Sequence, residues 1–159
     1  MKGPVREAEL QQLQTLVGKE IGVSQWVAVS QDYIDRFADL TDDHQPIHVD
    51  PAVAAQTQWG NTIAHGFLVL ALISNFAYQV VPRIRGTHSS LNYGFNRVRF
   101  ISPVPSGSRV RGRFTLSSIE RRHDGSVNVT CNVTVEIEGR DRPALVAEWI
   151  TTALFDKTQ

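Results

Sequence analysis

The chain has 159 residues, of which 42% are hydrophobic and 20% are charged, and its 16 basic residues balance its 16 acidic residues. This length and composition are typical of one globular domain, which we expect to span residues 1–159. A formal net charge of zero provides no overall field that would attract nucleic acid or anionic lipid, so neither is expected as a partner.

The cysteine content and the apolar segments indicate the cellular compartment of the protein. Cys131 is the only cysteine, which excludes an intramolecular disulfide and a zinc site built from several cysteines. It lies in an alternating segment, and we interpret it as a small buried apolar residue. The N-terminal sequence has no apolar core of signal-peptide length, and the apolar run 67–73 is too short to span a bilayer. We therefore expect a cytoplasmic protein.

The first third of the chain alternates between helix and strand signals. Residues 6–18 carry apolar residues at helical spacing, which predicts a short helix within an N-terminal extension of residues 1–19. Residues 21–30 are typical of a strand. Ser30 is then expected to cap a helix that ends near Thr41. Its predicted apolar stripe consists of Tyr33, Ile34, Phe37 and Leu40.

The Asp50–Pro51 pair predicts the start of a second, short helix that runs to about residue 58. Residues 62–81 follow, apolar around nearly the whole helical circumference, which indicates a helix buried on most sides. Pro82 is expected to end it.

After Pro82 the apolar residues repeat every second position, which indicates strands with one buried and one wet face. The predicted strands are 88–100, 108–119, 126–138 and 144–155. This order fits the α+β class, with a curved antiparallel sheet wrapped around the long apolar helix. Such a sheet leaves an edge strand exposed, so pairing of two copies into a homodimer is expected.

A cluster of titratable residues lies between the first two predicted helices: Asp42, Asp43, His44 and His48. His44 and His48 have the spacing of two metal ligands on one helical face, but Pro46 between them disfavours a helix at Gln45. No third ligand is obvious in the sequence. We therefore expect no metal, and nothing in the sequence indicates another cofactor.

The acid–base interpretation of this cluster fits better than a metal site. Pro46 is expected to force a turn that folds His48 back toward Asp43. A carboxylate and an imidazole that face one water molecule can hold it, take its proton and return a proton elsewhere.

The segment Thr41–His48 resembles the motif of the MaoC-like dehydratase and (R)-specific enoyl-CoA hydratase family, commonly Ser/Thr-Gly-Asp-x-Asn-Pro-Leu/Ile-His. Residues 62–67 resemble the second conserved block of that family, and residues 93–107 resemble the third. The His-Gln-Pro-Ile-His version of the motif is most similar to relatives of nodulation protein N. The resemblance covers about residues 20–155 and implies the hot-dog fold.

Two residues depart from the family motif. Asp42 stands where glycine is usual, so the backbone there is expected not to need a conformation reserved for glycine. Gln45 stands where asparagine is usual, which bears on the geometry of the loop more than on the reaction.

The resemblance implies that Asp43 and His48 are the catalytic pair and that the substrate is a trans-2-enoyl-CoA, hydrated to an (R)-3-hydroxyacyl-CoA. It also implies that the first turn of the long helix, at Gly66, binds the thioester oxygen through backbone N–H groups. His65 and Ser74 are further candidates for contact with substrate, although for His65 a structural role is the favoured interpretation. The arginines that are candidates for binding the CoA phosphates are Arg83, Arg85, Arg97 and Arg99.

Three alternatives remain open at this stage. One is a hot-dog acyl-CoA thioesterase, which would not need the Asp-x4-His spacing. Another is a 3-hydroxyacyl-carrier-protein dehydratase, which runs the same chemistry backward on another carrier. The last is a non-catalytic acyl-CoA binding module, which would not need the pair. The accepted acyl length depends on packing beside residues such as Phe67, Leu70, Phe76 and Tyr78.

Overall fold

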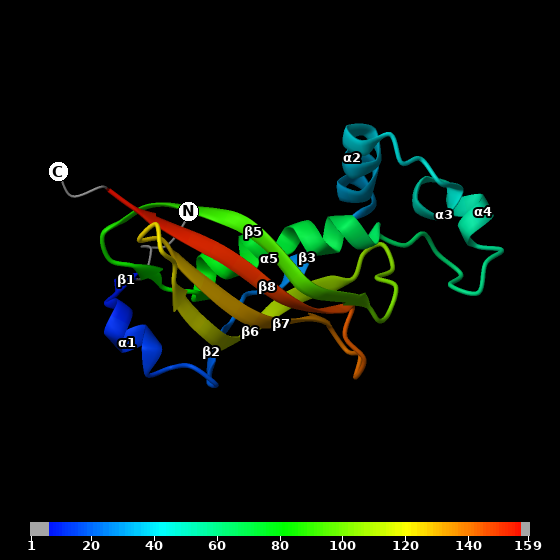
Figure 1. Ribbon diagram of the computed structural model, residues 1–159. Coiled ribbons are helices and arrows are strands. Elements are labelled where there is room, and N and C mark those ends of the chain that lie inside the picture. Colours follow the sequence, from blue (N-terminus) through cyan, green and yellow to red (C-terminus); the bar gives the residue numbers. More distant parts are fainter. Residues whose placement is uncertain (1–6, 157–159) are drawn as a thin grey trace.

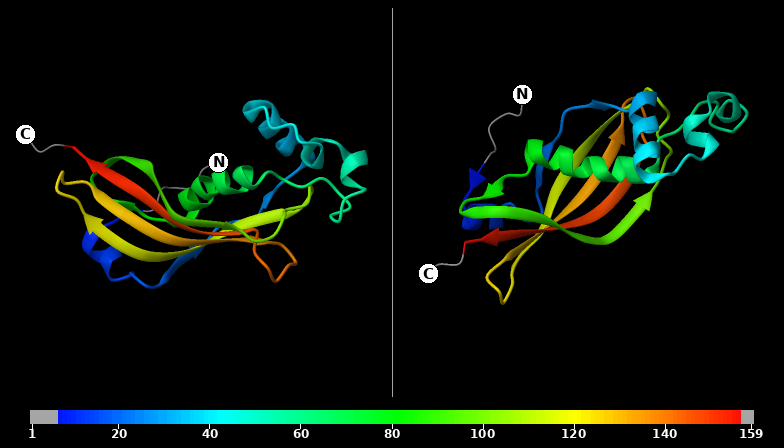
Figure 2. Two further views of the ribbon diagram at one scale, coloured as in Figure 1. Left: turned by 45° about the vertical axis from the view of Figure 1, so that its right-hand side comes forward. Right: turned by 90° about the horizontal axis from the view of Figure 1, so that it is seen from above.

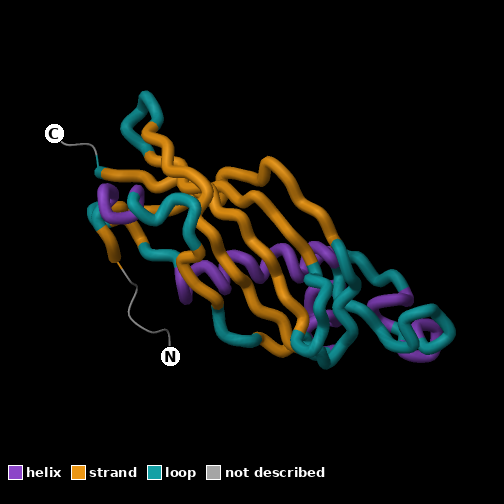
Figure 3. The backbone as a smooth tube through the Cα atoms, turned by 90° about the horizontal axis from the view of Figure 1, so that it is seen from below, coloured by secondary structure: helices purple, strands orange, loops and turns teal. Residues whose placement is uncertain are grey.

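The computed structural model describes residues 7–156, so the part of the predicted N-terminal extension in residues 1–6 lies outside the described residues. Its main feature is an antiparallel sheet that curves around one long helix, α5 (Gly66–Val80) (Figure 1). Seen from below, α5 crosses behind the strands (Figure 3), and seen from above it lies along the sheet (Figure 2). The predicted α+β arrangement, a hot-dog fold, is confirmed.

The sheet has the strand order β2-β6-β7-β8-β5, and β3 also pairs with β6. Its strands are β2 (Glu20–Val23), β3 (Val27–Ala28), β5 (Thr87–Phe100), β6 (Arg109–Arg121), β7 (Val127–Ile137) and β8 (Leu145–Phe155). The four strands predicted after Pro82 are thus confirmed to within two residues at each end. The short strands β1 (Glu7–Ala8) and β4 (Arg83–Ile84) form a separate parallel pair.

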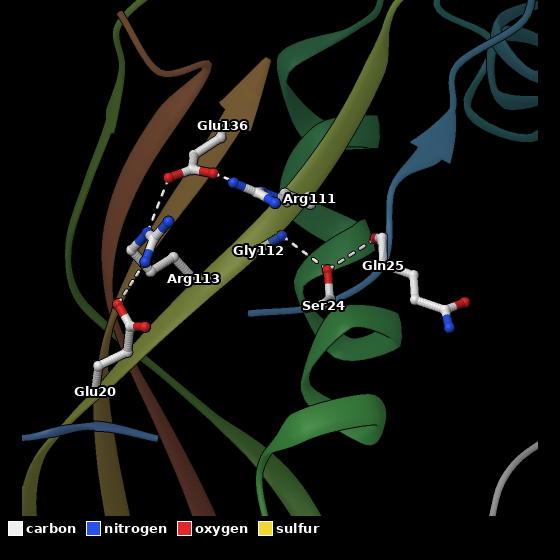
Figure 4. Close-up of polar contacts among 7 residues, drawn as sticks. All are labelled: Glu20, Ser24, Gln25, Arg111, Gly112, Arg113 and Glu136. Atoms are coloured by element: carbon white, nitrogen blue, oxygen red, sulfur yellow. Dashed lines mark hydrogen bonds and ion pairs between the residues drawn. The ribbon is translucent and has the colours of Figure 1, made fainter. Parts of the chain in front are cut away.

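The prediction of a single strand over residues 21–30 is wrong. The segment divides into β2 and β3, which both pair with the same edge of β6. Ser24 lies between them. Its backbone N–H donates to the Gly112 carbonyl at 2.8 Å, and its hydroxyl accepts from the Gly112 N–H at 3.0 Å. The Ser24 hydroxyl therefore accepts the Gly112 N–H in place of a backbone carbonyl, and the ladder between this segment and β6 is interrupted (Figure 4).

The helices before α5 differ in extent from their predictions. Helix α1 (Leu10–Gln14) is shorter than the predicted 6–18, and α4 (Pro51–Ala54) ends well before residue 58. Helix α2 (Gln31–Thr41) has the predicted bounds, but Leu40 is 85% exposed and Tyr33 is partly exposed, so the predicted apolar stripe narrows to Ile34 and Phe37. Helices α2, α3 (Pro46–Val49) and α4 gather at the N-terminal end of α5 (Figure 1).

Helix α5 begins at Gly66 rather than at residue 62, and Val81 before Pro82 ends it as predicted. The expectation that it is buried on most sides is wrong for the single chain. Phe67 is 69% exposed and Tyr78 is 77% exposed, while the opposite side, which carries Leu72 and Phe76, is buried against the sheet. None of the helices within residues 7–156 is long and apolar enough to cross a membrane.

The buried side of α5 rests on the sheet where two strands carry glycine. A Cβ atom added to Gly112 of β6 would lie 2.9 Å from the Phe76 Cβ and 2.8 Å from the Phe114 ring. One added to Gly22 of β2 would lie 2.7 Å from the Val80 Cβ. The helix therefore approaches the sheet at a distance that leaves no room for side chains at these two positions.

The core formed in this way includes Val29, Ile34, Leu68, Leu72, Ile73, Phe76, Phe114, Val133, Val135, Leu145 and Trp149. Cys131 is 2% exposed in this core, and burial raises the pKa of its thiol to about 12, which agrees with its interpretation as an apolar residue. A smaller cluster joins Leu13 of α1 to Ile84 and Val127 and holds the N-terminal segment against the sheet.

Charged side chains connect the strands on the other face of the sheet (Figure 4). Arg113 of β6 donates to Glu20 of β2 at 2.6 Å and to Glu136 of β7 at 2.8 Å. Arg111 donates to the second Glu136 oxygen at 2.6 Å, and its guanidinium lies 4.4 Å from the Trp26 ring centroid. Burial opposes ionisation of Glu136, yet the two arginine hydrogen bonds outweigh it and lower the pKa of that carboxyl.

The close packing at Gly112 predicts that Gly112→Ala destabilises the protein, by about 1–3 kcal/mol, because the new methyl group must displace Phe76 or Phe114. Gly94→Ala is the matched control. Gly94 lies in β5 with no atom within 4 Å of an added Cβ, so this change should leave the free energy of unfolding nearly the same. Urea unfolding of both variants measures the difference, and equal midpoints would contradict the packing argument.

Candidate active site

Asp43 follows directly on the end of α2. The Ser30 hydroxyl caps this helix by accepting from the Tyr33 N–H at 3.2 Å, as predicted. The helix ends at Asp42, whose φ of 55° and ψ of 22° place it in the left-handed region. Within residues 7–156 it is the only non-glycine residue with positive φ. The turn thereby directs Asp43 toward the N-terminal end of α5.

The argument that residue 42 does not need a glycine conformation is therefore corrected. The backbone takes the conformation that glycine adopts most readily, and aspartate is one of the few other residues that tolerate it. The motif that this segment resembles has glycine at this position, and this chain makes the turn with aspartate.

His48 lies in α3, a four-residue helix that begins at Pro46. Proline suits the first helical position because the N–H that it lacks has no partner there. His48 is 7% exposed, and its Nδ1 lies 2.6 Å from the Ile63 carbonyl oxygen. A carbonyl only accepts, so Nδ1 carries the hydrogen and the lone pair of the neutral ring is on Nε2. Burial, and to a smaller extent His65, lower the pKa of His48, against the Ile63 hydrogen bond and Asp43, which raise it.

The residues before α5 are extended rather than helical, which explains the late start of that helix. The Ile63 N–H donates to the Ile47 carbonyl at 3.1 Å, and the Ala64 N–H donates to the Val104 carbonyl at 2.8 Å. These bonds hold the segment between α3 and the loop that follows β5. They also place the Ile63 carbonyl against His48.

His65 is the last residue before α5 and is 2% exposed. Its Nε2 lies 2.9 Å from the Asp43 carbonyl oxygen and 3.9 Å from an oxygen of the Asp43 carboxylate. Its ring stacks on His48, with centroids 3.8 Å apart and an angle of 28° between the planes. The structure thus brings Asp43, His48 and His65 together, with ligand atoms within 4.8 Å of one another.

His44 is directed elsewhere: its Nε2 lies 3.0 Å from Asp39, and that hydrogen bond raises the pKa of His44. The expectation that His44 and His48 do not form a helical metal pair therefore holds. His65 supplies the third potential ligand that the sequence did not reveal. However, a metal ion bound by Asp43, His48 and His65 would need the lone pair on His48 Nε2, which a water molecule also requires.

A pocket of about 430 Å³ opens beside His48. Its walls are mostly apolar and come from the start of α5, the residues just before it, and the end of β5 with the loop that follows. They include Ile63, Gly66, Phe67, Val69, Phe100, Ile101, Pro103 and Val104. A pocket of this volume and polarity is typical of a small-molecule site.

Gly66 is the first residue of α5 and lies in the pocket wall. The first N–H groups of a helix have no acceptor within it, so they are available to a negatively charged oxygen. A Cβ atom on Gly66 would lie 3.0 Å from the Phe100 ring. A side chain at residue 66 would therefore require the Phe100 ring to shift by a few tenths of an ångström.

The other predicted contacts with substrate are not among the residues that line this pocket. Ser74 lies two turns further along α5 and accepts a hydrogen bond of 3.4 Å from Asn92 of β5. Arg85 is paired with Glu9 at 3.0 Å, and Arg99 donates to the Val98 carbonyl at 2.7 Å. Arg83 and Arg97 are exposed. The roles of Ser74 and of these arginines in binding substrate stay predictions.

Gln31 is a residue of the site that sequence reasoning missed. Its Nε2 donates to the His48 carbonyl at 2.8 Å and to Asp35 at 2.7 Å, and its Oε1 accepts from the Thr62 hydroxyl. One side chain thus joins α2 to both segments that form the site. Nothing in the local sequence indicates this role, because its partners are 17 and 31 positions away.

These features define a hot-dog protein with a carboxylate and two histidines at the N-terminal end of its central helix. Residues 12–138 match the MaoC-like domain family. The chain is 49% identical over 153 residues to nodulation protein N of Rhizobium meliloti (strain 1021), an alignment that covers 96% of this chain and 95% of that protein. It is 46% identical to 3-hydroxyacyl-thioester dehydratase Z of Mycobacterium tuberculosis (strain ATCC 25618 / H37Rv), covering 87% of this chain and 91% of that protein.

Among solved structures, the fold matches the (R)-hydratase from A. caviae involved in PHA biosynthesis. The TM-score is 0.70 and the identity 26%, and the match covers 85% of this chain and 94% of that one. The chain belongs to the MaoC-like dehydratase family and is a hydro-lyase of that family. Its similarity to nodulation protein N over nearly its whole length confirms the subgroup indicated by the sequence.

The left-handed turn at Asp42 predicts opposite effects for two substitutions. Asp42→Gly relieves the conformation and should leave the protein as stable as before or more stable, whereas Asp42→Ala should destabilise it by about 1 kcal/mol. Thermal unfolding compares the two. A variant with alanine that is as stable as the variant with glycine would show that the turn at residue 42 is unstrained.

Proposed function

We propose that this chain catalyses the reversible hydration of a trans-2-enoyl-CoA to an (R)-3-hydroxyacyl-CoA, with Asp43 and His48 as the acid–base pair. The observation that supports this most directly is the meeting of these two side chains beside an apolar pocket at the start of α5. The named relatives, a 3-hydroxyacyl-thioester dehydratase and an (R)-hydratase, support the reaction class and its handedness.

His48 is suited to accept a proton from water. Its Nδ1 hydrogen is engaged by the Ile63 carbonyl, which leaves the Nε2 lone pair for a water molecule. Because burial lowers the pKa of His48, the neutral form that has this lone pair persists to a lower pH than in an exposed histidine. The Asp43 carboxylate, whose side chain is 41% exposed, is the second group that can orient the same water.

The proposed reaction adds the water oxygen to C3 of the enoyl group, and the π electrons of the C2–C3 double bond shift toward the thioester carbonyl. The pair takes one proton from the water and C2 receives one proton, so Asp43 and His48 end the reaction with their starting charges. Backbone N–H groups at Gly66 stabilise the negative charge that develops on the thioester oxygen. The apolar walls keep other water away from the acyl chain.

The competing functions differ in which catalytic side chains they require. A thioesterase has no use for the imidazole at His48, and a binding module has no use for either member of the pair. A carrier-protein substrate in place of CoA would present the same thioester to the same residues, so this choice rests on the carrier and is decided by assay.

We also propose that the protein is a homodimer that pairs through α5 and the edge strand β5. These two elements carry exposed apolar side chains that include Phe67, Leu91, Tyr93, Phe95 and Phe100. The two elements are contiguous, since Asn92 contacts Ser74 and Phe100 packs edge-on against Phe67 at 5.9 Å. A second copy would cover this surface and pair the free edge of the sheet.

Hydration of crotonyl-CoA and octenoyl-CoA tests the proposed reaction through the loss of conjugated-thioester absorbance. The protein should consume the enoyl-CoA and form the (R) product, which a stereospecific dehydrogenase identifies. Asp43→Asn and His48→Gln should each lower kcat by about a hundred- to ten-thousand-fold, because each removes one proton-transferring group. Treatment with a chelator should leave the rate unchanged.

His44→Gln is the control for these variants, since His44 faces Asp39 outside the pocket, and its kcat should equal that of the unaltered protein. Release of free thiol from saturated acyl-CoA without hydration would favour the thioesterase. Dehydration of a 3-hydroxyacyl carrier protein in the absence of activity on CoA esters would assign the other carrier.

Light scattering tests the proposed dimer, which should have twice the 17.7 kDa mass of one chain. Leu91→Glu places a charge on the proposed interface and should yield monomers. Leu40→Glu alters an even more exposed leucine on α2 and should leave the dimer intact. A monomeric mass for the unaltered protein would contradict the proposal.

A further inference from the structure

His65 directly precedes α5 without capping it, as Glu9 and Gln45 precede α1 and α3 without capping them. Ser30 and Asp50 use their side chains to cap the helices that follow them, whereas the His65 side chain makes no such bond to α5. Its ring turns instead toward the segment that joins α2 to α3. It is therefore free to contact Asp43, which lies in that segment, and His48, which lies in α3.

The first contact fixes the backbone at Asp43. Nε2 of His65 lies 2.9 Å from the Asp43 carbonyl oxygen, and because that oxygen only accepts, Nε2 carries the hydrogen. The bond acts at the residue that follows the left-handed turn of Asp42, where α2 has ended. It thereby sets the point from which the Asp43 carboxylate projects.

The second contact fixes the face of His48. The two imidazole rings are stacked at 3.8 Å, while the Phe37 ring lies 5.1 Å from the His65 ring. The edge of the His48 ring is already held by the Ile63 carbonyl at 2.6 Å. His65 adds a contact on its face, so the ring is restrained both in its plane and against tilting.

The remaining nitrogen, Nδ1 of His65, is buried and has no hydrogen-bond partner within the described part of the chain. With the hydrogen on Nε2 this nitrogen is an acceptor. An unpaired buried acceptor still costs free energy, so a residue selected for stability alone would not require an imidazole here. His65 is also only 2% exposed, so almost none of its surface is open to a substrate in the pocket.

We propose that His65 is a positioning residue that holds Asp43 and His48 at their working separation, and that it does so without touching the substrate. This inference rests on the proposed catalytic role of that pair. One imidazole meets both members, the first through its N–H and the second through its face. A displacement of reacting groups by about 1 Å can cost about a hundredfold in rate, which is the scale of effect expected here.

Two substitutions separate the two contacts. His65→Phe keeps a ring to stack on His48 and removes the hydrogen bond to Asp43. His65→Gln keeps an N–H donor for the Asp43 carbonyl and removes the ring. Each should lower kcat by about tenfold to a hundredfold with little change in KM. Thermal unfolding of each variant shows whether a loss of kcat comes from misfolding. Because phenylalanine and glutamine differ in shape, one variant still tests the proposal if the other fails to fold.

A titration of the His48 ring protons by NMR supplies a readout that does not depend on turnover. The titratable groups that face His48 are His65 and Asp43, and burial is the main cause of its lowered pKa. His65→Gln removes both a neighbour that lowers the pKa and part of the cover, so the pKa of His48 should rise. His65→Phe keeps the cover, and the rise should be smaller.

The outcomes separate this proposal from the proposed function. A raised KM with unchanged kcat would make His65 a substrate contact and overturn the positioning role, as would an unchanged kcat and an unchanged His48 titration in both variants. If the unaltered protein hydrates no enoyl-CoA, the proposed function fails. The NMR titration then still shows whether His65 stacks on and restrains His48.

Discussion

The seating of α5 on the sheet is the constraint on which the rest of this structure depends. Gly22 and Gly112 leave the space that Val80 and Phe76 fill, so the helix lies close to β2 and β6 along its buried side. That contact fixes the position of the helix against the sheet. Its first residues, with free N–H groups, are thereby held beside the loop after β5, and the pocket forms between them.

The site is completed by backbone contacts as much as by side chains. The extended segment before α5 bonds to Ile47 on one side and to Val104 on the other, and its Ile63 carbonyl orients His48. Gln31 joins the start of α2 to the same region. Because α3 has only four residues and the segment before α5 is extended, these hydrogen bonds hold the side chains of the site in place.

The chemistry follows from the difference in environment between the two members of the pair. His48 is buried against another imidazole and an apolar wall, which favours its neutral form, while Asp43 stands at the edge of the site with its side chain partly open to solvent. A buried proton acceptor and a more exposed carboxylate can share one water molecule. The exposed apolar face of α5 and β5 lies next to this site, so a partner that covers it would also shape the entrance.

The period of the apolar residues was enough to predict the strands after Pro82. Local capping predicted the extent of α2 and its cap at Ser30, and a short motif singled out Asp43 and His48. Only the tertiary structure decided the start of α5, the division of the first strand at Ser24, the left-handed turn at Asp42 and the meeting of His65 and Gln31 with the site. Each of these depends on hydrogen bonds or ring contacts between residues far apart in the chain, such as Ser24 with Gly112 and His65 with Asp43. Periodicity and local propensity carry no information about such partners, since folding alone brings them within reach.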